Sequence, residues 1–310
     1  MTQLIDRTTR GVYIIAATPF AEDGALDLDS LDRLVDFYAE TGVTGLTLLG
    51  MMGEADKLTP EERRAVIDRM MSRAGALPVV VGVSDAGIGN LTDLGRHAMD
   101  RGAAGLMVAP SRGPAREDRV EGYFHAVAAA LGADVPLVFQ DFPLTTGVPV
   151  SPALIRRLSN DLPQMVMLKH EDWPGLTKIT ALRAQESAAD VPRLSILCGN
   201  GGLYLPQELA RGADGAMTGF AYPEALVQTV ALHHAGRTDA AEDLFDAYLP
   251  ILRHEQQPGW GLALRKHILM RRGAIASAAT RAPGPRLTTT DVAELERLMA
   301  RTERRLAERG

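Results

Sequence analysis

The sequence predicts an α/β protein, a (β/α)8 or TIM barrel with a C-terminal helical appendage. Eight short apolar runs recur at intervals of roughly 20 to 35 residues, and a helical pattern follows each, which is typical of parallel βαβ units. Eight such units match a closed barrel. The main alternative, an open doubly wound sheet, would show a glycine-rich phosphate loop after its first strand. The stretch Ala17-Thr18-Pro19-Phe20 does not form one.

The expected strands are short and apolar, as strands buried on both faces of a parallel sheet are. They cover residues 11–18, 44–50, 78–84, 105–110, 136–140, 165–169, 194–198 and 214–218. The helices between and after them are expected over residues 29–40, 90–101, 117–131, 151–158, 175–185, 203–211 and 223–234. One more helix begins after the second strand, where Thr59 suits the N-cap, Pro60 the first helical position and Glu62 the capping box.

Three further helices are expected beyond the eighth unit, over residues 239–254, 261–271 and 290–308. The breakers Gln257-Pro258-Gly259 and Pro283-Gly284-Pro285 separate them. We therefore divide the chain into a catalytic barrel of residues 1–235 and a helical segment of residues 236–310 that packs on it. A separate mobile domain is the alternative, and the short linkers argue against it.

Composition narrows the classes of function. A net charge of −6 disfavours a nucleic-acid partner, which would usually meet a basic face. The single cysteine, Cys198, excludes an intrachain disulfide framework. No apolar run approaches the length of a membrane span, and residues 1–10 lack the apolar core of a signal peptide. We expect a cytoplasmic protein without a membrane partner. The seven histidines are scattered, so the sequence predicts neither a metal site nor a cofactor.

The candidate catalytic pair lies at the end of the sixth expected strand, where Lys169 closes an apolar run and Glu171 follows two residues later. Strand side chains alternate, so these two residues share a face if the strand continues that far. Active sites of such barrels lie at the carboxyl ends of the strands. A buried amine is a nucleophile toward carbonyl carbons. The structural alternative is a lysine that pairs with Glu171 or reaches water at a strand end.

Other candidate substrate-binding residues stand at the ends of neighbouring strands. Gly50 and Gly53 bracket Met51 and Met52, and such a turn exposes backbone N–H groups that suit a carboxylate. An ordinary strand-to-helix turn is the alternative. Further candidates follow the fifth, first and seventh strands: Gln140, Thr18 and Asn200.

Taken together, these features resemble the dihydrodipicolinate synthase and N-acetylneuraminate lyase family of class I pyruvate aldolases, over essentially the whole chain. The matching motifs are Thr18-Pro19-Phe20, Gly53-Glu54, the loop with Pro143, Thr146 and Gly147, and Lys169. The resemblance implies that Lys169 is the Schiff-base lysine, that the substrate is a small 2-keto acid, and that the chain assembles as a homotetramer, a dimer of dimers.

The chain also departs from the family pattern. Met51 and Met52 replace two threonines, Gln140 replaces a catalytic tyrosine, and Ser111-Arg112 stands where a tyrosine pair is usual. Thr145 replaces a carboxylate-binding arginine of the synthases. The usual tyrosine–threonine–tyrosine proton relay of the family is therefore missing, which argues against dihydrodipicolinate synthesis as the activity of this chain.

One branch of the family matches better. Gln140-Asp141-x-Pro143, Lys169-x-Glu171 and the run Gly215-Ala216-Met217-Thr218-Gly219 are similar to the 2-keto-3-deoxy sugar acid dehydratases, notably the L-2-keto-3-deoxyarabonate dehydratases. This resemblance adds Met217 to the candidate substrate-binding residues and predicts a Schiff-base lyase that dehydrates a 2-keto-3-deoxy sugar acid. Two alternatives stay open. One is a retro-aldolase that releases pyruvate, and the other is a non-catalytic binding protein on a degenerate barrel.

Overall fold

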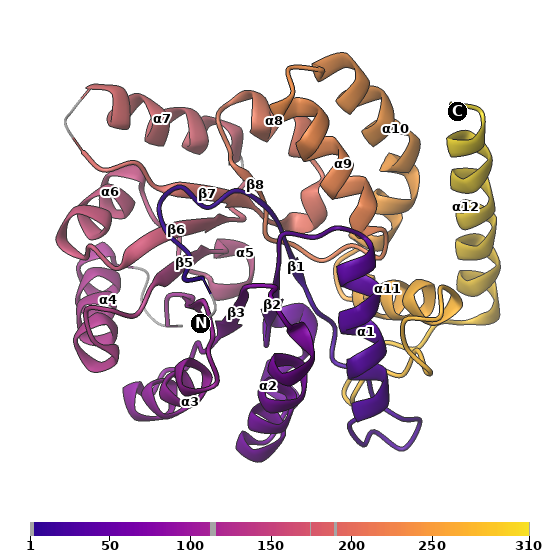
Figure 1. Ribbon diagram of the computed structural model, residues 1–310, viewed down its shortest axis with the longest axis horizontal. Helices are drawn as coiled ribbons and strands as arrows, with labels where there is room; N and C mark the ends of the chain where they lie inside the picture. Colours follow the sequence, from indigo (N-terminus) through magenta and orange to yellow (C-terminus); the bar gives the residue numbers. More distant parts are fainter. Residues whose placement is uncertain (1–2, 112–115, 174, 189–190, 310) are drawn as a thin grey trace.

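Eight parallel strands close into a barrel in the order β1 to β8, as predicted (Figure 1). The computed structural model describes residues 3–111, 116–173, 175–188 and 191–309. Every strand pairs with its neighbours in sequence, and β8 pairs with β1. The strands are β1 (Gly11–Ile15), β2 (Gly45–Leu48), β3 (Val79–Gly82), β4 (Gly105–Val108), β5 (Leu137–Asp141), β6 (Met165–His170), β7 (Ser195–Cys198) and β8 (Gly215–Ala216).

Helices surround the barrel, and three more follow the last barrel unit (Figure 1). The barrel helices are α1 (Leu28–Glu40), α2 (Pro60–Ala74), α3 (Ile88–Asp100), α4 (Glu117–Leu131), α5 (Pro143–Thr146), α6 (Pro152–Asp161), α7 (Gly175–Ala188), α8 (Leu205–Ala210) and α9 (Pro223–His234). The C-terminal helices are α10 (Thr238–Glu255), α11 (Gly261–Arg271) and α12 (Thr289–Ala307). In the described residues, none of these helices has the length and apolarity to cross a membrane.

Local signals explain where several elements begin and end. The capping box at the start of α2 is confirmed, since Thr59 accepts from the Glu62 N–H and Glu62 accepts from the Thr59 N–H. The first strand was expected to reach Thr18 but ends at Ile15. Pro19 lacks an N–H for a strand ladder, and Phe20 instead forms an isolated bridge with Leu26. The short turns η1 (Met51–Gly53), η2 (Ala55–Lys57) and η3 (Asn200–Gly202) were not predicted.

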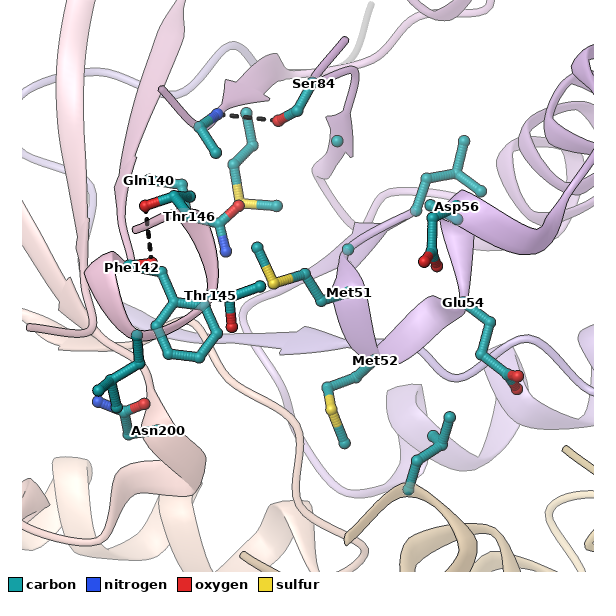
Figure 2. A pocket seen from close by; sticks show the side chains of 18 of the residues that line it. Met51, Met52, Glu54, Asp56, Ser84, Gln140, Phe142, Thr145, Thr146 and Asn200 are labelled. Atoms are coloured by element: carbon teal, nitrogen blue, oxygen red, sulfur yellow. Dashed lines mark hydrogen bonds between the residues drawn. The ribbon is translucent and has the colours of Figure 1, made fainter. Parts of the chain in front are cut away.

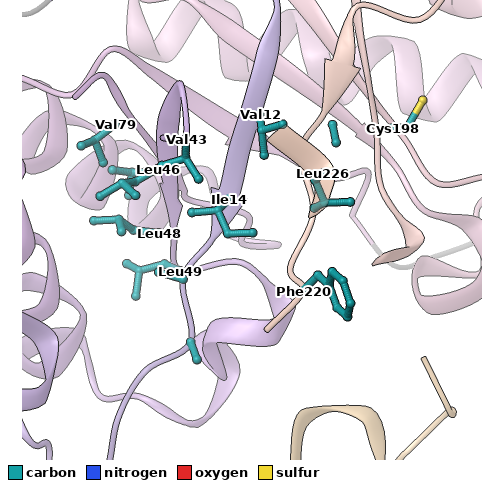
Figure 3. Packing of buried hydrophobic residues seen from close by; sticks show 14 of the residues in the cluster. Val12, Ile14, Val43, Leu46, Leu48, Leu49, Val79, Cys198, Phe220 and Leu226 are labelled. Atoms are coloured by element: carbon teal, nitrogen blue, oxygen red, sulfur yellow. The ribbon is translucent and has the colours of Figure 1, made fainter. Parts of the chain in front are cut away.

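Side chains of each strand alternate between the barrel interior and the helices. The inner cluster contains Val80, Met107, Val138, Met167, Leu197 and Met217. The outer cluster packs under the helices and includes Val12, Ile14, Leu46, Leu48 and Val79 (Figure 3). Because Lys169 lies two residues after Met167, the same alternation turns it toward the barrel interior, at the carboxyl end of β6.

A buried ion pair attaches the C-terminal helices to the barrel. Glu255 at the end of α10 is 0% exposed, and its Oε1 lies 2.5 Å from Nε of Arg265 on α11. Arg265 also donates to the Gly219 carbonyl, and the Ala221 N–H donates to Glu255. These contacts join α10 and α11 to the segment between β8 and α9. The division of the chain at residue 235 remains a prediction.

Candidate active site

Lys169 and Glu171 meet in the structure, as strand alternation predicts. The Lys169 side chain comes from β6 and the residue is 2% exposed, while Glu171 follows the strand and is 6% exposed. The Lys169 Nζ lies 2.8 Å from the Glu171 Oε2. A carboxylate at this distance can both pair with the ammonium and accept its proton.

Glu171 is held by residues from the neighbouring strands. Gln140 on β5 donates from Nε2 to the Glu171 Oε2 over 2.8 Å, and it pairs in register with Lys169. Asn200 after β7 donates from Nδ2 to the Glu171 carbonyl over 3.0 Å. Gly199 leaves the necessary space, because a Cβ there would lie 2.1 Å from the Glu171 Cγ. Three strand ends therefore set the position of this carboxylate.

His170 lies between Lys169 and Glu171 in the chain, and it points the opposite way, toward the helices. Its Nε2 lies 3.0 Å from the Gly175 carbonyl at the start of α7. Near His170, Asp141 on β5 forms an ion pair of 2.5 Å with Lys178 on α7.

Two other buried titratable groups lie outside the barrel interior. Glu208 on α8 adjoins Cys198, and burial raises the pKa of the Glu208 carboxyl to about 7. Burial also raises the pKa of the Cys198 thiol, which makes it a structural residue rather than a nucleophile.

The turn after β2 presents backbone donors. Gly50 precedes η1, and the N–H groups of Met51 and Met52 stand in its first turn, where a helix has no internal acceptor for them. Thr18 does not take part in this way. Its hydroxyl is buried and donates to the Gly53 carbonyl over 2.6 Å, so it supports the turn from behind.

A cavity of about 1060 Å³ opens at the carboxyl ends of the strands. Its volume is at the upper end of the range that is usual for small-molecule pockets. Figure 2 shows the Met51 side chain pointing toward Gln140 and Thr145, whereas the Glu54 side chain points away from them. The wall includes Gly50, Met51, Met52, Ser84, Gln140, Phe142, Thr145, Trp173, Asn200 and Gln256.

Five of the nine predicted site residues line this cavity, namely Gly50, Met51, Met52, Gln140 and Asn200. The wall does not include Lys169 or Glu171, and Gln140 connects it to them through its bond to Glu171. The wall also lacks Met217, which is 0% exposed and packs inside the barrel. The predicted position of Arg112 lies outside the described residues.

Ser84, Phe142, Trp173 and Gln256 are wall residues that sequence reasoning missed. Ser84 lies at the end of the third expected strand, where its position alone could have marked it. Gln256 comes from the connection between α10 and α11, which carries no periodic signal. Its Nε2 is buried and has no hydrogen-bond partner in the described chain.

Away from the cavity, the described residues contain one group with the spacing of a metal site. Glu121 and His125 on α4 and Asp161 on α6 bring their ligand atoms within 4.8 Å of one another. The guanidinium of Arg157 lies 3.4 Å from Glu121, which opposes a cation there. This surface group has no connection to Lys169.

A comparison with family models decides the classification. The model of the Dihydrodipicolinate synthetase family matches residues 8–302. The chain belongs to this family. It is therefore a lyase or synthase of the class I, pyruvate-dependent type, and its substrate is a small 2-keto acid. In the described residues, the cavity wall contains no tyrosine.

Individual members of the dihydrodipicolinate synthetase family resemble the chain to different degrees. The 4-hydroxy-tetrahydrodipicolinate synthase of Methanothrix thermoacetophila is 33% identical over 247 residues, 79% of this chain and 81% of that protein. The L-2-keto-3-deoxyarabonate dehydratase of Azospirillum brasilense is 30% identical over 292 residues, 92% of each chain. A crystal structure of dihydrodipicolinate synthase from Rhodopseudomonas palustris has a TM-score of 0.95 and 48% identity, and covers 97% of this chain and 100% of that one. The relatives thus divide between synthase and dehydratase.

Proposed function

We propose that this enzyme dehydrates a 2-keto-3-deoxy sugar acid through a Schiff base on Lys169. The observation that carries the proposal is the position of the Glu171 carboxylate, 2.8 Å from the Lys169 Nζ. If Lys169 forms an imine with C2 of the substrate, a base close to Lys169 is also close to C3, the neighbouring carbon. This is the carbon whose proton a dehydration removes.

The first stage is imine formation. Glu171 accepts a proton from the Lys169 ammonium, and the free amine attacks the C2 ketone of the substrate. Glu171 then returns the proton to the C2 hydroxyl of the carbinolamine, which leaves as water. The product is a protonated imine that withdraws electrons from C3.

The second stage removes the C4 hydroxyl. Glu171 accepts a proton from C3, and the C2–C3 double bond of an enamine forms. The enamine electrons then form the C3–C4 double bond while the C4–O bond breaks, and Glu171 protonates the leaving hydroxyl to water. Hydrolysis of the imine releases the unsaturated 2-keto acid and regenerates Lys169. The net change is the loss of one water from the substrate.

Substrate binding follows from the cavity wall. The N–H groups of Met51 and Met52 suit the C1 carboxylate. Gln140 hydrogen-bonds a substrate hydroxyl, and in doing so it gives up its bond to Glu171 and opens the way from the cavity to Lys169. Asn200 offers its side-chain oxygen to a more distant hydroxyl. Thr18 and Met217 are proposed to act indirectly, by supporting the turn and the barrel interior.

The nearest rival is retro-aldol cleavage that releases pyruvate. It requires a base at the C4 hydroxyl, and the family's tyrosine for this step is Gln140 here. The cavity wall in the described residues has no tyrosine that could replace it. A relative named as a dehydratase aligns over 92% of the chain. These points favour dehydration over cleavage and over the synthase reaction.

Borohydride trapping followed by product analysis tests the proposal. We expect reduction in the presence of pyruvate or 2-keto-3-deoxy-L-arabonate to give a stable adduct on Lys169, detected by peptide mass, and Lys169→Ala to give none. Without borohydride, the sugar acid should lose one water and release no pyruvate. Release of pyruvate would instead establish retro-aldol cleavage. If no 2-keto acid gives an adduct, the remaining hypothesis is a non-catalytic binding protein.

We further propose that the enzyme works in the cytoplasm as a homotetramer, a dimer of dimers. Both proposals come from the sequence and its family resemblance. Sedimentation velocity of the purified chain tests the assembly, since a monomer of 33.3 kDa sediments well apart from a tetramer.

A further inference from the structure

A buried ion pair links α11 to the turn beside the cavity. Lys266 on α11 is 0% exposed, and its Nζ lies 2.6 Å from the Glu54 Oε1. The same Nζ donates to the Ala279 carbonyl over 2.8 Å and lies 4.4 Å from the centre of the Phe20 ring. Desolvating two charges is costly, so a buried ion pair adds little net stability compared with apolar packing. The place of this pair suggests a different role.

Glu54 has an unusual backbone conformation. It joins η1 to η2 with φ 53° and ψ 34°, in the left-handed region that side chains other than glycine seldom adopt. Its carboxylate is held at three points, by Lys266, by the Lys57 Nζ at 2.9 Å and by the Arg281 N–H at 3.0 Å. Such a conformation persists where surrounding contacts impose it.

This residue is the direct continuation of the turn that carries the free N–H groups. The Glu54 N–H donates to the Met51 carbonyl over 3.1 Å, which closes the turn. The Glu54 side chain points away from Gln140 and Thr145, whereas the Met51 side chain points toward them (Figure 2). Because Lys266 on α11 fixes the Glu54 side chain, it also constrains the backbone of the adjoining residues Met51 and Met52.

We propose that Lys266 is a positioning residue, which acts through Glu54 to hold the Met51–Met52 turn in the shape that binds the substrate carboxylate. The inference rests on the proposed function, in which that turn receives the C1 carboxylate. The proposal also means that the C-terminal helices contribute to substrate binding, because α11 supplies the Lys266 ammonium that holds Glu54.

The proposal predicts a pH dependence. Burial lowers the pKa of Lys266 to about 8, although the Glu54 charge opposes this shift. The other charged groups facing it are Lys57 on η2 and Arg281 after α11, and Arg281 is itself paired with Glu62 on α2. As the pH rises through about 8, Lys266 loses its charge and its hold on Glu54 weakens. Substrate affinity should fall over this range.

The test compares Lys266→Met with Arg271→Met, which removes an exposed cation from the same helix. The half-saturating concentration of pyruvate for borohydride trapping is measured at pH 7 and pH 9. At pH 7 we expect Lys266→Met to raise it about tenfold, as for the loss of one hydrogen bond to a charged group. The maximal trapping rate should stay near the wild-type value. At pH 9 the difference from the wild type should be much smaller than at pH 7, and Arg271→Met should match the wild type throughout.

Hydrogen exchange of the ligand-free protein gives a second reading that does not depend on the reaction. Amides of residues 50–57 should exchange faster in Lys266→Met than in either reference protein. Wild-type exchange and wild-type half-saturation in the variant would overturn the proposal. An equal loss of affinity at both pH values would overturn the proposal too, because a disturbed local structure, and not the loss of the Lys266 charge, would explain it.

Two further outcomes stay decisive. If the wild type traps no 2-keto acid, the proposed function fails, and the exchange comparison alone decides whether Lys266 holds the turn. If Lys266→Met does not fold, Glu54→Gln tests the same pair, since it keeps an oxygen for Lys57 but removes the charge that Lys266 pairs with. The same loss of affinity and faster exchange are expected, and unchanged values would count against the proposal.

Discussion

Glu171 is the residue whose replacement separates imine formation from the proton transfers that follow. We expect Glu171→Gln to slow the exchange of the pyruvate C3 protons for deuterium by roughly 10²–10⁴-fold, the usual worth of a general base. Lys169 remains, so a borohydride adduct should still accumulate on long incubation. Proton NMR of pyruvate in D2O measures the exchange and needs no knowledge of the natural substrate.

Asp172→Asn is the matched control for this experiment. Asp172 is the next residue in the chain, but its carboxylate turns outward to Lys178, 2.9 Å away. The Asp172→Asn variant should exchange the C3 protons of pyruvate at the wild-type rate. Wild-type exchange in Glu171→Gln would instead mean that another group removes the proton.

Single residues differ in how well the sequence predicts them. Lys169 and Glu171 could be paired in advance, because strand alternation is a local rule and both residues sit at one strand end. The hydroxyl of Thr18 could not be placed, since its direction depends on the Gly53 carbonyl of another strand's turn. Gln256 enters the wall only through the packing of α10 on the barrel, which no local pattern records.

Helix α8 carries a buried acid that makes stability depend on pH. Burial raises the pKa of Glu208 in the fold from 4.5 to about 7. Between these values the folded state holds a proton that the unfolded state has lost, so the stabilising effect is complete below pH 4.5 and declines up to about pH 7. Each pKa unit corresponds to about 1.4 kcal/mol, so the full effect is on the order of 3 kcal/mol.

We expect Glu208→Gln to remove this decline, because an amide stays neutral at every pH. Urea unfolding at pH 5 and pH 8 measures it. The wild type should lose more stability than the variant between the two values. Glu242→Gln, at an exposed position on α10, should behave as the wild type does. An unchanged pH dependence in Glu208→Gln would show that another group is responsible.

At the scale of elements, the sequence predicts what is periodic and misses what is not. All eight strands and the long helices were predicted, because apolar runs and helical spacing repeat along the chain. The three-residue turns η1, η2 and η3 were missed, and each of them includes or adjoins a left-handed residue, Glu54 between η1 and η2 and Asn200 in η3. Their backbones are set by tertiary contacts rather than by residue type. These turns form part of the site, so its details were the least predictable part.

The barrel and the C-terminal helices depend on each other across the whole molecule. Buried groups of the barrel, among them the Ala221 N–H and the Gly219 carbonyl, find their partners on α10 and α11. In the other direction, α11 sends Lys266 to Glu54 beside the cavity. A chain cut after residue 235 would leave these barrel groups buried without partners or open to water. Unpaired buried polar groups are costly, so the barrel alone should not fold stably.

Arg265→Met tests this dependence within the full chain. Methionine fills much of the volume but leaves Glu255 as an unpaired buried acid, which should cost roughly 3–5 kcal/mol in the free energy of unfolding. Burial already raises the pKa of Glu255, and loss of Arg265 raises it further, so the variant should be less damaged at pH 5 than at pH 8. Urea unfolding should be monitored with one probe in the barrel and one in the C-terminal helices. Both probes should report a single shared transition, at a lower urea concentration than in the wild type. If only the C-terminal helices unfolded early, residues 236–310 would be a separate domain, and the coupling between α11 and the site would lose its structural basis.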